Sequence, residues 1–320
     1  MGLLLAGFMT MWAQLPNDKF GKPSDMEWDF QAWGEAPDAE AVVLYKSMEV
    51  TYQLASSFSS YSSAYQELST STVPNIGTNG LDFGGTSVTY VCKLRTKILK
   101  DEGARYANIG LVYYSDKEHE LTQTDEIASL KVRVYSKNAK GKVEKVNVKT
   151  DSKAVERIDD NYVMQLVRVP NVKAGDIIEY QYEVTSNRVS FLYDWSFQEE
   201  IPVLYSKCDL DIPGALAFNI NAPIHPLIKR KVERGTVRLE SHTADMKAAK
   251  TYPTNHYIVT GENILPKSLD LQRKDPEVDA ARVSSTTGQV ANISGVLNSR
   301  TIPAPAPMPK GVSHLQIGVK

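Results

Sequence analysis

Apolar and polar residues alternate in many short runs along the chain. In Val88–Ile98 most even positions are apolar, while Lys93, Arg95 and Lys97 occupy odd positions. The same period of two recurs in the runs Val42–Tyr52, Leu130–Val134, Ile178–Val184, Leu204–Ile212 and Val237–Leu239. Such strands are typical of antiparallel sheets that cover a core with one face and meet water with the other.

Turn signals separate these runs. Asn138–Gly141, Lys173–Asp176 and Arg234–Gly235 each place a glycine between two strand-like segments. Glycine readily adopts the positive φ that many turns need. No strand is followed by a long helical pattern, which argues against a parallel α/β sheet. We therefore predict an all-β fold, a large antiparallel β-sandwich.

The predicted β-sandwich domain occupies residues 36–266, and the segments around it differ in character. Residues 14–35 form an N-terminal segment in which Ser24 and Glu27 have the spacing of a capping box, so we expect a short helix there. A Ser/Gly-rich insertion spans residues 55–87. The tail, residues 267–320, is predicted to be a partly helical linker, with the helix over 276–296 and a last strand over 314–319.

The N-terminus is predicted to be an export signal. Gly2–Trp12 is apolar and uncharged, and the small residue Ala13 follows it. The run is about half the ~20 residues that a helix needs to cross a bilayer. This pattern indicates a signal peptide at residues 1–13, although no Lys or Arg precedes the apolar run. We expect an exported protein of the periplasm or cell envelope without a transmembrane helix; the alternative is a buried N-terminal strand or helix.

Composition excludes several classes of protein. The chain has 320 residues, with 36 Lys and Arg against 38 Asp and Glu, which gives a formal net charge of −2. That balance argues against nucleic-acid binding, which needs a basic surface. Apolar residues make up 42% of the chain and charged residues 23%, as in ordinary folded proteins. Two cysteines are too few for a disulfide-rich scaffold or a four-cysteine zinc site.

The sequence offers no recognisable catalytic constellation. It contains neither a phosphate-binding glycine loop nor a nucleophile elbow, and its five histidines lack the spacing of metal ligands. We therefore expect no catalytic residue, no cofactor and no metal in this chain. Cys92 and Cys208 fall on the apolar faces of their strands. They are predicted to form either a disulfide with each other or two separate buried thiols, and a buried thiol is a poor nucleophile.

Binding surfaces are the remaining candidates. Trp28, Trp33, Trp195 and Tyr193 are aromatic residues that could stack on sugar rings. Trp33 also recurs at helical spacing with Met26 and Phe30, a pattern that favours packing of a helix on a core. The charged residues Asp209, Asp211 and Lys229–Lys231 are expected to be solvated strand faces and edges.

Three segments together carry a family resemblance. They are Lys97–Gly103 with Tyr106–Asn108, Val169–Tyr182, and Asp194–Gln198 with Ile201–Val203, and Ala36–Leu44 precedes them. In this order they resemble the domain of unknown function that precedes transglutaminase-like domains in exported proteins of Bacteroidetes-type bacteria. The similarity extends from residue 30 to residue 265, and Val169–Tyr182 is its most specific part.

This resemblance implies a context without assigning a reaction. In that family the Cys, His and Asp machinery belongs to a separate downstream domain, so no catalytic residue transfers to this chain. The first hypothesis is an exported, non-catalytic interaction or accessory domain whose partner is a transglutaminase-like domain or another envelope protein. The second is a carbohydrate-binding module or a weak glycoside-processing enzyme. The stretch after Pro266 departs from the family pattern, which leaves a stand-alone relative or a fragment as alternatives.

Overall fold

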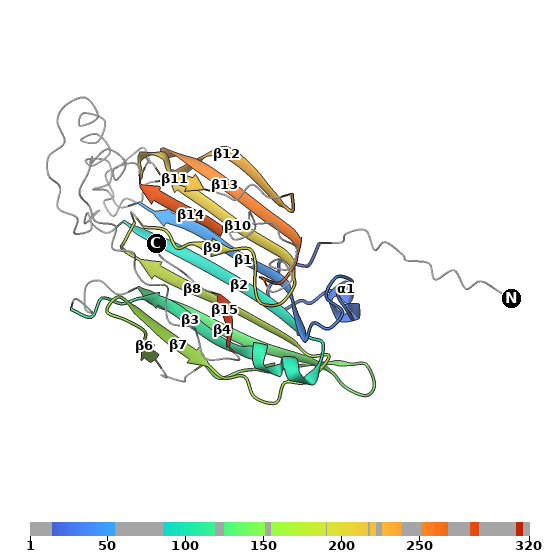
Figure 1. Ribbon diagram of the computed structural model, residues 1–320. Helices are drawn as coiled ribbons and strands as arrows, with labels where there is room; N and C mark the ends of the chain where they lie inside the picture. Colours follow the sequence, from blue (N-terminus) through green and yellow to red (C-terminus); the bar gives the residue numbers. More distant parts are fainter. Residues whose placement is uncertain are drawn as a thin grey trace, which may run out of the picture.

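An eight-stranded sheet is the largest element of the protein (Figure 1). The computed structural model describes residues 15–54, 86–118, 125–150, 155–189, 191–216, 218–221, 226–238, 251–267, 282–287 and 312–315. These residues are mostly β, with few helices. The predicted signal peptide at residues 1–13, nearly all of the insertion 55–87 and most of the tail lie outside the described residues.

The large sheet has the strand order β12-β13-β10-β1-β2-β8-β4-β5. Its strands are β1 (Ala41–Gln53), β2 (Ser87–Ile98), β4 (Glu126–Lys137), β5 (Val143–Asn147), β8 (Ile177–Ser186), β10 (Val203–Pro213), β12 (Ile228–Arg238) and β13 (Thr251–Ile264). Neighbours run antiparallel except β1 and β10, which are parallel. The prediction of a purely antiparallel sheet is therefore wrong at this pair, because β1 and β10 are far apart in sequence and no hairpin fixes their relative direction.

Two smaller sheets accompany the large one. The first has the order β15-β3-β7-β6 and the second the order β11-β14-β9. Their strands are β3 (Asn108–Tyr114), β6 (Val155–Arg157), β7 (Tyr162–Val167), β9 (Trp195–Ser196), β11 (Phe218–Asn221), β14 (Arg282–Thr287) and β15 (Val312–Leu315), and two 3-10 turns are η1 (Asp101–Ala107) and η2 (Gly214–Leu216). The helix predicted over 276–296 is wrong at Arg282–Thr287, whose β-branched Val and Thr residues suit the extended conformation.

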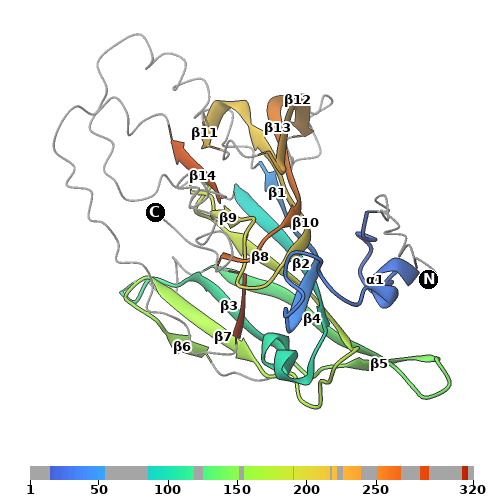
Figure 2. The same cartoon turned by 45° about the vertical axis from the view of Figure 1, so that its right-hand side comes forward.

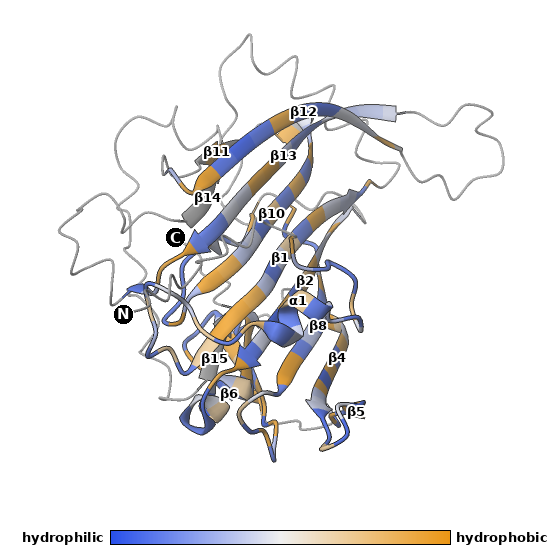
Figure 3. Cartoon of the chain, turned by 90° about the vertical axis from the view of Figure 1, so that its right-hand side faces the viewer, coloured by the Kyte–Doolittle hydropathy of each residue, from blue (hydrophilic) through white to orange (hydrophobic). Residues whose placement is uncertain are grey.

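Two apolar clusters lie on opposite faces of the large sheet. Figure 2 shows α1 on one side of this sheet and β3, β6 and β7 on the other. The main core joins the inward faces of β1, β2, β8 and β10 to side chains of both small sheets. The second cluster is smaller and includes Trp28, Trp33, Leu44 and Tyr135. Figure 3 shows hydrophobic and hydrophilic residues alternating along the large sheet, with α1 (Asp25–Asp29) lying against it.

A β-bulge in β1 moves its apolar residues from one face of the sheet to the other. The pairing of β1 with β2 shifts between Val43 and Tyr45, and a bulge of one extra residue reverses the side on which later side chains point. Leu44 therefore belongs to the second cluster, whereas Met48 belongs to the main core. The prediction that the even positions of Val42–Tyr52 share one face is wrong for this reason.

The short N-terminal helix agrees with its predicted capping box. The Ser24 hydroxyl accepts a hydrogen bond from the Glu27 N–H at 3.4 Å, and the Glu27 carboxylate accepts one from the Ser24 N–H at 2.6 Å. The helix ends at Asp29, so Trp33 lies beyond it and forms an isolated bridge with Ala36. Among the described residues, no helix is long and apolar enough to cross a membrane.

Candidate functional site

The N-terminal segment, residues 15–35, covers part of the polar face of the large sheet. Sequence alternation places Arg95 and Lys97 on a solvated face, yet their exposed fractions are 1% and 3%. The prediction fails because α1 and the residues before it lie on these side chains. Both charges are consequently desolvated, which is costly unless they find partners.

Arg95 finds acceptors for all five of its guanidinium N–H donors. Its Nε and one Nη2 donor bind the Glu179 carboxylate at 3.1 and 2.5 Å. Its Nη1 binds the Glu27 carboxylate at 2.6 Å and the Asn17 carbonyl at 2.8 Å, and Nη2 also binds the Lys19 carbonyl at 2.9 Å. We call Arg95, Glu27 and Glu179 the Arg95 network. A fully satisfied buried network of this kind fixes one arrangement of the segments that contribute to it.

The second oxygens of both carboxylates are satisfied as well. Glu27 Oε2 accepts from the Ser24 hydroxyl at 2.9 Å in addition to the Ser24 N–H. Glu179 Oε2 accepts from the Gly21 N–H at 2.7 Å and from the Tyr135 hydroxyl at 2.9 Å. Burial and the neighbouring Glu179 charge raise the pKa of Tyr135 to about 12, so this phenol remains a donor at physiological pH.

The backbone at Gly21 comes close to the side chains of Glu179 and Arg133. Its φ is +91°, a conformation that side chains with Cβ rarely adopt. A Cβ at this position would lie 2.5 Å from Nη1 of Arg133. Glycine therefore lets the N–H of residue 21 reach Glu179.

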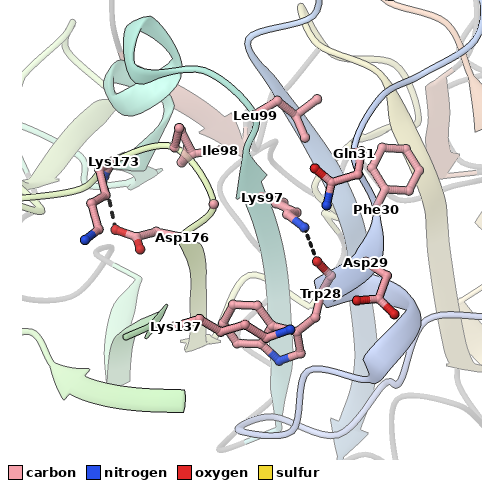
Figure 4. Close-up of a pocket in the computed structure, with 12 residues that line it drawn as sticks. Trp28, Asp29, Phe30, Gln31, Lys97, Ile98, Leu99, Lys137, Lys173 and Asp176 are labelled. Atoms are coloured by element: carbon pink, nitrogen blue, oxygen red, sulfur yellow. Dashed lines mark hydrogen bonds between the residues drawn. The ribbon is translucent and has the colours of Figure 1, made fainter. Parts of the chain in front are cut away.

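A cavity of about 270 Å³ opens where the N-terminal segment meets the end of the sheet (Figure 4). Its lining comes from four stretches: Trp28–Gln31, Lys97–Leu99, Lys137 and Lys173–Asp176. We call this cavity the lysine pocket. Two of the three segments that carry the family resemblance, Lys97–Gly103 and Val169–Tyr182, contribute to its wall.

Lys97 is the buried lysine of the lysine pocket. Its Nζ donates to the carbonyl oxygens of Trp28 and Glu27, the latter at 3.3 Å. These carbonyls belong to the last turn of α1, which contains no basic residue of its own, and a cation is favourable at that end of a helix. Burial, together with the nearby Lys137 charge, lowers the pKa of Lys97 to about 8.

Lys137 and Lys173 are exposed, whereas Asp176 is buried. Lys137 places its Nζ 4.9 Å from the ring centroid of Trp28, a cation–π contact. The Asp176 carboxylate accepts the Lys173 N–H at 3.0 Å and so fixes the turn before β8. Gly175 in this turn has a φ of +89°, which confirms the positive φ predicted for it. The residues that line the pocket include no Cys, Ser or His, and its ionisable side chains are lysines and aspartates.

The four predicted aromatic residues do not gather on one exposed surface. Trp28 and Trp33 are each 7% exposed and belong to the second cluster. Trp195 and Tyr193 are 2% and 4% exposed and lie in the main core on the opposite face of the sheet. Trp195 Nε1 donates to the Ser206 hydroxyl at 3.0 Å. Of the four residues, only Trp28 lines the lysine pocket.

The two cysteines are free, buried thiols on separate strands. Met48 on β1 is paired with Cys92 on one side and with Cys208 on the other. The cysteines are thus two strands apart, about 10 Å, whereas a disulfide needs Cα atoms within about 7 Å. Of the two predicted alternatives, the structure has separate thiols. Burial raises the pKa of Cys92 to about 12 and that of Cys208 as well, which makes both thiols unreactive.

Other polar groups pair across strands. Lys46, which breaks the apolar alternation of β1, forms an ion pair with Glu199 and lies 4.7 Å from the centroid of the Trp195 ring. His256 on β13 lies 2.5 Å from Asp209 on β10, a pair that sequence spacing could not reveal. Within the described part of the chain, no three His, Cys, Asp or Glu residues are arranged to hold a metal ion. The basic run Lys229–Lys231 lies on β12, an edge strand with exposed side chains, as predicted.

Comparisons with known proteins identify a family and distantly similar solved structures. The family model of a domain of unknown function with solved structure, DUF3857, matches residues 85–250. A crystal structure of a "putative protease" from Parabacteroides distasonis is similar with 17% sequence identity and a TM-score of 0.43. That match covers 78% of this chain and 41% of the other, so the chain spans about two fifths of that relative. No curated protein matches.

Proposed function

The chain belongs to the DUF3857 family of domains of unknown function, and from this premise we propose that it is an exported, non-catalytic interaction domain. Its partner would be a transglutaminase-like or peptidase-like protein of the cell envelope. The apolar N-terminal run Gly2–Trp12 supports export. The order of the family-like segments described above supports the partner class.

The observation that carries the proposal is the lysine pocket. It brings the ammonium groups of Lys97, Lys137 and Lys173 to one cavity beside apolar side chains. Charged groups in an open cavity provide electrostatic complementarity for a partner, which promotes specificity and association rate. Catalysis by either cysteine would require a thiolate, and burial raises the pKa of both thiols.

The partner and the lack of catalysis are tested together. The full chain is immobilised, and an exported transglutaminase-like domain from the same genome is passed over it in an interferometry measurement. We expect reversible binding that weakens with salt, and no hydrolysis or transamidation of a peptide library by this chain alone. Absence of binding, or turnover by the chain alone that a single substitution abolishes, would contradict the proposal.

The glycan-binding alternative receives no support from the predicted aromatic residues. Sugar stacking requires aromatic faces that are open to the ligand, and all four predicted side chains are buried in two separate clusters.

A further inference from the structure

The lysine pocket has more positive charge than its own carboxylates neutralise. Among the described residues, none of Lys97, Lys137 and Lys173 has a carboxylate within ion-pair distance. Asp176 is 2% exposed and is engaged by the backbone of its own turn. Asp29 is exposed at the rim. The lining therefore contains three cations and two carboxylates, which leaves one net positive charge.

Lys97 distinguishes this pocket from a group of surface lysines, because its side chain is buried and held in place. Its exposed fraction is 3%, and it is anchored by two carbonyl oxygens of α1. An ammonium group has three N–H donors, so one donor of Lys97 has no acceptor among the described residues and is available to a ligand. Desolvation and repulsion from Lys137 disfavour its charged form, and a bound anion would relieve both.

The walls of the pocket indicate what the anion is attached to. Trp28, Phe30 and Leu99 provide apolar surface beside the lysines (Figure 4). A ligand that fits both features has an anionic group joined to an apolar body. A monoanion would neutralise the single net positive charge of the pocket. A dianion would leave the occupied pocket with one net negative charge. The pocket also lacks arginine, the residue that most often binds phosphate groups bidentately.

We propose that the lysine pocket binds a carboxylate of a peptide segment, with an apolar residue next to the carboxylate packed against Trp28 and Phe30. This inference rests on the proposed function and names the chemistry by which the partner would be recognised at this site. Lys97 would position the carboxylate at the floor, and Lys137 and Lys173 would hold it from the rim.

The test uses the full chain and small probes. N-acetyl-phenylalanine supplies the carboxylate and the apolar body, and N-acetyl-phenylalanine amide is its uncharged match. Backbone amide NMR titrations follow residues 28–31 and 173–176. We expect the acid to bind with a millimolar Kd and the amide at least about tenfold more weakly, a factor that corresponds to about 1.4 kcal/mol.

Variants assign the binding to the pocket. Lys173→Gln and Lys137→Gln, both at exposed lysines and therefore safe for folding, should each weaken acid binding about threefold or more. Lys100→Gln is the matched control, because Lys100 lies on the surface and pairs with Asp38 outside the pocket. Lys97→Gln should reduce binding further. Affinity should also fall as the pH rises above 8, as Lys97 loses its proton.

Three outcomes would overturn the inference: equal binding of the acid and the amide, tighter binding of inorganic phosphate than of the acid, or insensitivity to Lys137→Gln and Lys173→Gln. The titration with N-acetyl-phenylalanine contains no partner protein. Its failure therefore leaves the interferometry result of the proposed function untouched, and a failure to bind the partner leaves the titration untouched.

Discussion

Glu27→Gln tests whether the Arg95 network holds the N-terminal segment on the sheet. The substitution keeps the size of the side chain but removes its charge. The exposed fraction of Glu27 is 0% and that of Arg95 is 1%. Glu27 receives donors from Arg95 on one oxygen and from Ser24 on the other, so a glutamine amide would have to point its N–H donors at one of them.

The expected loss of stability follows from these contacts. Removing one partner of a buried ion pair costs about 3–5 kcal/mol, because the remaining charge stays buried. Arg95 retains Glu179 as a partner in Glu27→Gln. We therefore expect a loss near the lower limit, about 3 kcal/mol in the free energy of unfolding. Asp38→Asn is the control, because the Asp38 side chain is fully exposed and such pairs contribute about 0–1 kcal/mol.

Two measurements separate global from local effects. Urea denaturation followed by circular dichroism gives the free energy of unfolding of the full chain. Limited proteolysis in the absence of urea reports whether residues 15–35 detach while the sheet stays folded. Glu27→Gln should lower the free energy of unfolding, speed proteolytic cleavage in residues 15–35, or do both. A variant within about 0.5 kcal/mol of the wild type with unchanged cleavage would refute the role of the network.

Three further predictions address other parts of the structure. The pKa of Lys97 is lowered from 10.5 to about 8 in the folded protein, so between these pH values the folded state binds fewer protons than the unfolded state and the free energy of unfolding should rise with pH. Urea denaturation from pH 8 to pH 10 should therefore show the wild type gaining about 2 kcal/mol relative to Lys97→Met, and equal pH profiles of the two proteins would contradict a buried Lys97 ammonium group. Gly21→Ala should destabilise the protein by about 1–3 kcal/mol because of the strained φ and the contact with Arg133, whereas Gly141→Ala, which has the same sign of φ but open space, should cost less in the same assay. Mass spectrometry after alkylation should find Cys92 and Cys208 unlabelled in the native protein at neutral pH and both labelled in urea without reductant; protection in urea would indicate a disulfide and would show the strand register to be wrong.

Local patterns predicted several strands of the large sheet and the helix cap because the information for these elements lies in neighbouring residues. The alternation in Val88–Ile98 and Ile178–Val184 marks the faces of β2 and β8 that enter the main core. The Ser24 and Glu27 spacing forms the predicted cap. Gly175 has the positive φ that the turn before β8 requires. Each of these features depends on residues within a few positions of one another.

The features that sequence did not reveal depend on distant pairs. Arg95 is 68 residues from Glu27 and 84 from Glu179, so its polar side of β2 looked like a solvated face. The bulge at Leu44 involves a single residue and reverses the faces of the rest of β1. Lys46 in an apolar run was the one visible sign that this strand is unusual. The four predicted aromatic residues are buried in two separate clusters, and sequence alone does not report the burial that determines whether a ring can meet a ligand.

Hydrogen–deuterium exchange of the full chain, measured with and without an exported transglutaminase-like domain, tests the central claim most directly. We expect binding to slow exchange at the backbone amides of residues 28–31, 97–99 and 173–176, which line the lysine pocket. Slower exchange confined to the opposite, small-sheet side of the protein, or no change at any described residue, would contradict the claim that this chain binds its partner through the pocket.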